Sequence, residues 1–135
     1  MWTNDLSVDN VMIDNEHKQL FMLIDNFYKG IKENSPKERL EELILGLFNY
    51  TKTHFKNEEQ HMRNMNYPDL EVHKSLHASF VDQVNNYYDR LKGGKLILSI
   101  EVTNFLKDWL INHIKGSDQQ YAAFERTQKS MMNIN

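Results

Sequence analysis

Apolar residues recur along most of this chain at intervals of three and four, which is the spacing of an amphipathic helix. Leu20, Ile24 and Phe27 are one example of this spacing. Alternation with a period of two is not sustained in any segment, so the pattern indicates helices rather than a sheet. The predicted helices cover residues 14–33, 36–64, 68–91, 95–115 and, as a shorter segment, 118–130.

Four long helices with short connections favour an all-α fold, an up-down-up-down antiparallel four-helix bundle. With 135 residues, the chain is long enough for one domain with a real core and too short for two comfortable ones. We therefore expect a single domain over 1–135. Its expected parts are an N-terminal arm (1–13) anchored by Trp2, the bundle (14–115), and a short helix with a tail (116–135).

Capping and turn residues stand between the predicted helices. Asp14 is the expected N-cap of the first helix. Ser35 is the expected cap of the second, with Pro36 at its first helical position. The pair Gly93-Gly94 is typical of a turn, and Gly116-Ser117 is expected to break the last long helix.

Composition and charge exclude several classes of protein. The chain is 40% hydrophobic and 26% charged with a formal net charge of −3, so it lacks the basic excess of a nucleic-acid or anionic-membrane binder. Its apolar runs are too short to span a membrane. Cysteine is absent, which excludes disulfides and thiolate metal sites. The first residues show no signal-peptide pattern, so we expect a cytoplasmic protein.

Five of the six histidines continue the apolar stripes of the predicted helices. A single histidine on such a face is usually a hydrogen-bonded core residue, but five of them would each need a partner. Neutral imidazole is the commonest protein ligand for a metal, so a metal is the simplest shared partner. The five are His17 on the first helix, His54 on the second, His73 and His77 on the third, and His113 on the fourth.

These five histidines are expected to meet at one end of the bundle. His17, His73 and His77 lie near the starts of the first and third helices, whereas His54 and His113 lie near the ends of the second and fourth. In an antiparallel bundle, the starts of the first and third helices lie beside the ends of the other two. The common level is stronger support for a metal site than the number of histidines.

Two carboxylates extend the set. Glu58 lies one helical turn after His54, on the same face. Asp118 follows His113 by five residues, which advances about 140° on a regular helix, so the two share a face only if the helix bulges or breaks near Gly116-Ser117. The alternative is that Asp118 caps the last short helix. Glu59 and His61 are expected to face solvent.

Seven donors are too many for one ordinary metal site, because a structural zinc takes four protein ligands and a catalytic zinc three. Two metals suit the set if both carboxylates bridge and one solvent-derived oxygen is shared. Three histidines then complete a six-coordinate ion, and two histidines leave the other ion five-coordinate, with one open position. Nitrogen and oxygen ligation without thiolate favours iron over calcium. An open iron in an apolar pocket is a binding site for a diatomic gas.

The segments "IDNEHKQL", "HFKNEE", "HKSLH" and "HIKGSD" together resemble the ligand pattern of the hemerythrin family, specifically single-domain bacterial hemerythrins. The resemblance covers the chain from Trp2 to about Tyr121. It implies two iron ions with a bridging oxo or hydroxo group that bind O2 reversibly, as peroxide, on the open iron. Many relatives have Gln where this chain has Glu16, which adds a carboxylate near the site.

The resemblance also implies a role for each ligand. His73, His77 and His113 would hold the closed iron, His17 and His54 the open iron, and Glu58 and Asp118 would bridge them. An apolar lid over the open iron is expected from residues near these ligands, with ordinary core packing as the alternative. The lid residues are Leu20, Phe55, Trp109, Leu110 and Ile114.

The expected function is O2 carriage, storage, delivery or sensing, and not enzymatic turnover. The alternatives are a di-iron enzyme acting on O2, peroxide or nitric oxide, and an iron-storage protein. Ferritin-like di-iron sites use a Glu-x-x-His motif on two helices, and only Glu58 to His61 has that spacing here. O2 is the expected partner, nucleic acid and membrane are not expected, and the sequence does not specify a protein partner for O2 delivery.

Overall fold

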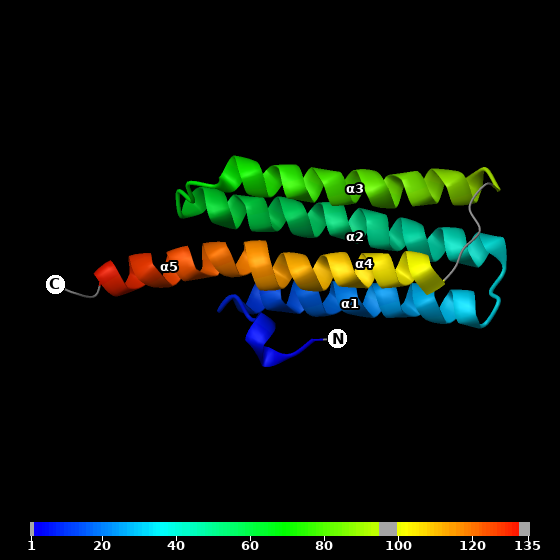
Figure 1. The fold of residues 1–135 in the computed structure, drawn as a ribbon, viewed down its shortest axis with the longest axis horizontal. Helices are drawn as coiled ribbons and strands as arrows, with labels where there is room; N and C mark the ends of the chain where they lie inside the picture. Colours follow the sequence, from blue (N-terminus) through cyan, green and yellow to red (C-terminus); the bar gives the residue numbers. More distant parts are fainter. Residues whose placement is uncertain (1, 95–99, 133–135) are drawn as a thin grey trace.

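The computed structural model describes residues 2–94 and 100–132, and these form a bundle of antiparallel helices (Figure 1). The described ranges contain no strand. Helix α1 packs against α2 and α4, and α2 packs against α3. The elements are η1 (Asn4–Leu6), α1 (Val11–Lys32), α2 (Lys37–Asn64), α3 (Leu70–Lys92), α4 (Ile100–His113), η2 (Ile114–Asp118) and α5 (Gln119–Met132). The predicted all-α four-helix bundle is confirmed.

The core consists of two apolar clusters at different levels of the bundle. The larger cluster includes Leu20, Phe55 and Ile114, and the smaller one, towards the end where α5 begins, includes Ile13, Met62 and Tyr121. Three helical segments, 13–20, 55–62 and 114–121, each begin in one cluster and end in the other. Each segment carries one buried polar residue between its two ends: His17, Glu58 or Asp118. A polar layer is enclosed by apolar packing on both sides.

Helix α1 begins three residues earlier than the pattern predicted. Asn10 is its N-cap, because the Asn10 side chain accepts a hydrogen bond of 3.0 Å from the Ile13 N–H. The prediction of Asp14 as the cap was wrong. Its carboxylate lies inside the first turn and accepts hydrogen bonds from the Ser7 hydroxyl and the Val8 N–H, at 2.6 and 2.9 Å. These bonds fasten the N-terminal arm to the helix.

Helix α2 begins at Lys37, one residue later than predicted. Pro36 has extended backbone angles, and its carbonyl accepts the first helical bonds from the Arg39 and Leu40 N–H groups. Pro36 therefore occupies the cap position itself, and Ser35 lies outside the helix, so the prediction of Ser35 as the cap was wrong. The predicted turn at Gly93-Gly94 is confirmed: α3 ends at Lys92, and Gly94 has a φ of 71°.

The predicted break at Gly116-Ser117 does not occur. The helix continues from α4 through a π-helical turn, η2, into α5, and the end of α5 extends beyond the turn between α2 and α3 (Figure 1). A π turn accommodates an extra residue without interrupting the helix, because its hydrogen bonds join residues five apart. The predicted start of the fourth helix, at residues 95–99, lies outside the described residues.

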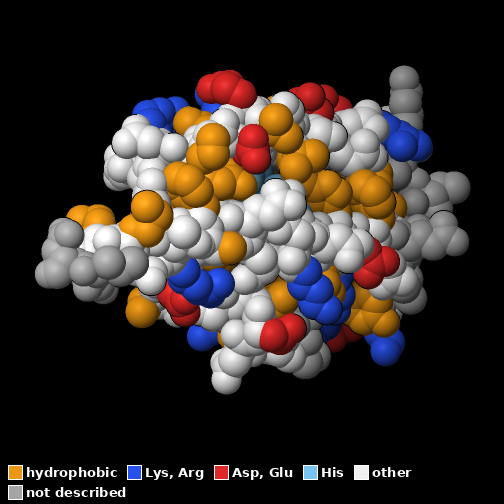
Figure 2. Space-filling view, turned by 60° about the vertical axis from the view of Figure 1, so that its left-hand side comes forward, with side chains coloured by type: hydrophobic (Ala, Val, Ile, Leu, Met, Phe, Trp, Pro, Cys, Tyr) orange, Lys and Arg blue, Asp and Glu red, His pale blue; other side chains and the backbone are white. Residues whose placement is uncertain are grey.

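The surface combines charged and apolar side chains. Trp2 packs partly buried against the larger core cluster, as expected for the anchor of the arm, and the Lys18 ammonium lies 5.2 Å from its ring centroid. In the face drawn in Figure 2, hydrophobic side chains form a band, with acidic and basic groups dispersed around it. None of the helices in the described ranges is both long and apolar enough to cross a membrane.

The cap of α1 should contribute measurably to stability. Replacing Asn10 by alanine removes the acceptor for the Ile13 N–H and should lower the free energy of unfolding by about 1 kcal/mol, whereas Asn10→Asp should preserve most of it. Denaturant unfolding of the two variants and the parent chain measures the difference. Equal stability of all three would show that this cap does not hold the start of α1.

Candidate metal centre

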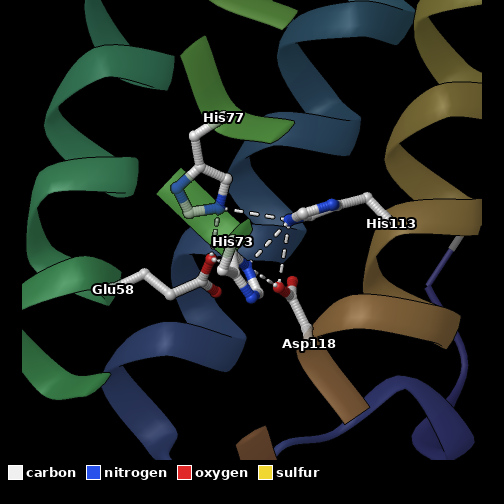
Figure 3. A group of neighbouring side chains, drawn as sticks. All are labelled: Glu58, His73, His77, His113 and Asp118. Atoms are coloured by element: carbon white, nitrogen blue, oxygen red, sulfur yellow. Dashed lines mark hydrogen bonds and ion pairs between the residues drawn. The ribbon is translucent and has the colours of Figure 1, made fainter. Parts of the chain in front are cut away.

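Seven buried side chains meet at one end of the bundle. The structure brings together every histidine and carboxylate that the sequence placed at this level, and their exposed fractions range from 0 to 7%. Figure 3 shows five of them pointing toward one another from α2, α3, α4 and the end of the π turn. The seven are His17, His54, Glu58, His73, His77, His113 and Asp118.

Three imidazoles face one oxygen of each carboxylate (Figure 3). The Nε2 atom of His113 lies 3.1 Å from the Nε2 atoms of both His77 and His73. Glu58 Oε1 lies 3.0 Å from His77 Nε2, and Asp118 Oδ1 lies 2.9 Å from His73 Nε2 and 3.1 Å from His113 Nε2. Five donor atoms therefore converge on one point.

The other two imidazoles face the remaining oxygens of the same carboxylates. His17 Nε2 lies 3.2 Å from both Glu58 Oε2 and Asp118 Oδ2, and His54 Nε2 lies 3.6 Å from Glu58 Oε2. Each carboxylate thus directs one oxygen to each group of histidines. The site has two halves, one with three imidazoles and one with two, which share Glu58 and Asp118.

The donor atoms fit metal ions better than they fit one another. Two ligand atoms about 2.1 Å from one ion and at right angles to each other lie about 3 Å apart, close to the Nε2 separations in the three-histidine half. Three mutually facing Nε2 atoms cannot all find hydrogen-bond acceptors in one another. On the other side of the site, the buried Nδ1 atom of His17 has no hydrogen-bond partner within the described structure.

Electrostatics also favour cations here. Burial by itself would lower the pKa of His17 and His73, but hydrogen bonds with Asp118 and Glu58 outweigh it and raise these pKa values to about 10 and about 9. Burial would raise the pKa of both carboxyl groups, yet the surrounding imidazoles hold the pKa of Glu58 and of Asp118 well below the ordinary values. The carboxylates remain charged and require positive charge beside them.

The π turn places Asp118 in this site. Because η2 spans Ile114–Asp118, the Asp118 carboxylate returns to the face of the helix that carries His113. Asp118 is fully buried within a continuous helix, so the alternative interpretation of this residue as a cap was wrong. The bulge that the spacing required is present, although as a π turn rather than a break.

Two outer carboxylates hold histidines of the cluster by their other ring nitrogen. His54 Nδ1 donates to Glu16 Oε1 at 2.7 Å, and His77 Nδ1 donates to Glu59 Oε2 at 2.8 Å. The expectation that Glu59 faces solvent was therefore wrong: the side chain is half-buried and accepts a hydrogen bond from His77. Such outer partners fix the ring orientation of metal-binding histidines.

The sixth histidine, His61, lies outside the cluster. The prediction that it faces solvent was wrong. His61 is half-buried, and its Nε2 lies 3.2 Å from Glu125 Oε1 on α5. The sequence did not show this contact because α5 was expected to follow a break. His61 belongs to neither half of the site.

Sequence reasoning missed Tyr121. Its hydroxyl donates a 2.8 Å hydrogen bond to Glu58 Oε2, on the side that faces His17 and His54. Burial, together with the nearby charge of Glu58, raises the pKa of Tyr121, so the phenol keeps its proton. The spacing of three residues from Asp118 on one helix was the available signal.

Two of the predicted lid residues, both aromatic, stack on histidines of the three-histidine half rather than of the two-histidine half. Phe55 stacks on the ring of His77 with a centroid distance of 3.7 Å, and half-buried Trp109 stacks on His113 at 4.5 Å. The aliphatic members are fully enclosed in the larger core cluster. They are Leu20, Leu110 and Ile114.

The fold and site define a helical-bundle protein with a buried histidine–carboxylate cluster of two halves that could hold metal ions. The sequence model of the hemerythrin family, described as the Hemerythrin HHE cation binding domain, matches residues 9–124. The chain belongs to the hemerythrin family, and the resemblance noted in the sequence is confirmed.

Individual relatives agree with this assignment. A myohemerythrin of Theromyzon tessulatum is 37% identical over 120 residues, covering 89% of this chain and 88% of the relative. A bacteriohemerythrin of Stenotrophomonas maltophilia (strain R551-3) is 32% identical over 122 residues, covering 90% and 78%. The crystal structure of a wild-type hemerythrin superposes with a TM-score of 0.85 at 25% identity, covering 91% of this chain and 95% of that one.

Two histidine substitutions test which histidines are needed to hold metal. His77→Ala removes one of the three facing Nε2 atoms and should abolish stable binding of two metals, whereas His61→Ala should leave the metal content unchanged. Metal analysis after gel filtration measures both. Loss of the metals from the His61 variant would show that the assigned donor set is wrong.

Proposed function

We propose that this chain is a non-haem di-iron protein that binds O2 reversibly, for carriage, storage, delivery or sensing. Membership of the hemerythrin family supports the proposal, and so does a donor set of imidazole and carboxylate without thiolate, which suits iron. When bound, two ferrous ions supply the two electrons that reversible O2 binding draws on.

The unequal division of the donors is the observation that carries this proposal. His73, His77 and His113 would hold one iron together with one oxygen from each carboxylate. His17 and His54 would hold the second iron with the remaining two oxygens. The second half has one protein donor fewer than the first, and that difference leaves a position for an exogenous ligand.

The protein around the site would exclude water and keep the ligands in place. All seven donor residues are buried, and Leu20, Leu110 and Ile114 belong to the apolar cluster beside them. Tyr121 donates a hydrogen bond to Glu58 and so fixes the shared carboxylate on the two-histidine side. We assign a binding rather than a catalytic role because imidazoles outnumber carboxylates in the donor set.

Anaerobic reconstitution tests the proposal. The full chain is loaded with ferrous iron without air, its metals are counted, and visible spectra are recorded before O2, after O2 and after purging. We expect two irons per chain, a colourless reduced form, and a charge-transfer band that appears with O2 and disappears on purging. A permanent ferric spectrum would contradict reversible binding and favour a di-iron enzyme. One metal per chain would contradict the two-iron site.

A leucine pair on α4 tests the apolar lid. Leu110→Ala and Leu106→Ala each open space in the core, and each should lower the free energy of unfolding by about 2–5 kcal/mol. Only Leu110 lies one helical turn from His113, so only Leu110→Ala should also hasten oxidation of the ferrous protein in air. Stopped-flow spectra and denaturant unfolding measure the two effects. Equal oxidation rates in the two variants would show that Leu110 is not part of the lid.

A further inference from the structure

Both outer carboxylates reach across from one helix to a histidine on the next. Glu16 on α1 accepts from His54 on α2, and Glu59 on α2 accepts from His77 on α3. Glu16 comes one residue before the inner residue His17, and Glu59 comes one residue after the inner residue Glu58. On a helix, each outer carboxylate therefore points about 100° away from its inner neighbour. This direction lets it meet the outer nitrogen of the neighbouring histidine.

Glu16 is held more completely than a surface carboxylate. Its Oε1 accepts from His54 Nδ1 at 2.7 Å, and its Oε2 accepts from the Asn57 side-chain amide at 2.8 Å. The side chain is 15% exposed. In the two-histidine half, the other imidazole, His17, has no partner for its Nδ1 atom in the described structure. In this half, the outer carboxylate contact through Nδ1 therefore falls on His54 alone.

A carboxylate that accepts from a ligand histidine makes the opposite ring nitrogen a stronger donor and fixes the ring orientation. We propose that Glu16 is a positioning residue of the two-histidine half, which orients His54 and, through its negative charge, favours the ferric over the ferrous state of the iron held there. The inference rests on the proposed function and adds the residue that sets how readily this iron is oxidised.

The test compares Glu16→Gln with Glu125→Gln in the full iron-loaded chain. Glutamine keeps an acceptor for His54 but removes the charge. Glu125 is a matched control because it also contacts a histidine, His61, and is 16% exposed, but that histidine lies outside the cluster. The measurements are metal content, midpoint potential, rate of oxidation in air and the Mössbauer spectrum.

We expect Glu16→Gln to retain two irons, to shift the midpoint potential to a more positive value, to slow oxidation in air, and to alter one of the two iron environments. Glu125→Gln should match the parent in all four measurements. Glu16→Ala removes the hydrogen bond as well and should weaken metal retention against a chelator by about 10–100-fold. A purely structural role would lower thermal stability without shifting the potential.

Two results would overturn the inference: a Glu16→Gln potential equal to that of the parent, or equal shifts in the Glu16 and Glu125 variants. If Glu16→Gln does not fold, Asn57→Ala replaces it, because this change frees one Glu16 oxygen and leaves the His54 contact. Its potential should shift in the opposite direction, to a more negative value, because Glu16 keeps its charge and loses the amide donor that partly offsets it, and no shift would also overturn the inference. Failure of the parent chain to bind two irons would instead contradict the proposed function.

Discussion

The structure depends on the burial of two carboxylates that hold negative charge and have no surface exposed to solvent. Glu58 and Asp118 have no exposed surface, and an isolated charge in such a position would be prohibitively unfavourable. Five imidazoles surround them and share their four oxygens. The resulting demand for positive charge explains why every helix of the bundle contributes a ligand-type residue at one level, and why that level is suited to hold cations rather than to pack as ordinary core.

The rest of the bundle supports this layer. Apolar clusters lie on both sides of it, so the polar side chains cannot relax toward water without opening the core. Contacts from the outside complete the support: Glu16 and Glu59 fix two rings, Tyr121 fixes one shared carboxylate, and aromatic rings stack on His77 and His113. The donors are preorganised, so little side-chain freedom remains to be lost when a metal binds.

The fold and the inner cluster could be predicted from sequence because both follow from helical periodicity. His54 and Glu58, or His73 and His77, are four apart and share a face on any regular helix. The caps were less predictable, since Asn10 and Asp14 are both suitable caps for α1, and the arm engages Asp14 and leaves the cap position to Asn10; at α2, Ser35 and Pro36 are adjacent candidates. Contacts between helices, such as Glu16 with His54, depend on the relative rotation of the helices, which periodicity does not specify. The same limit hid the contact of Glu59 with His77, whereas His61 and Tyr121 were missed because a break was expected before α5.

The π turn at Ile114–Asp118 has a consequence for how such centres are recognised. A histidine and an aspartate five residues apart on a late amphipathic segment do not match the helical period, and a search for regular spacing would discard them. In this chain the irregular spacing is itself information: it reports a local change of backbone hydrogen-bonding pattern. The number of residues between two ligands thus depends on the backbone geometry between them. A spacing that departs from the helical period can mark a ligand, as a spacing that matches it does.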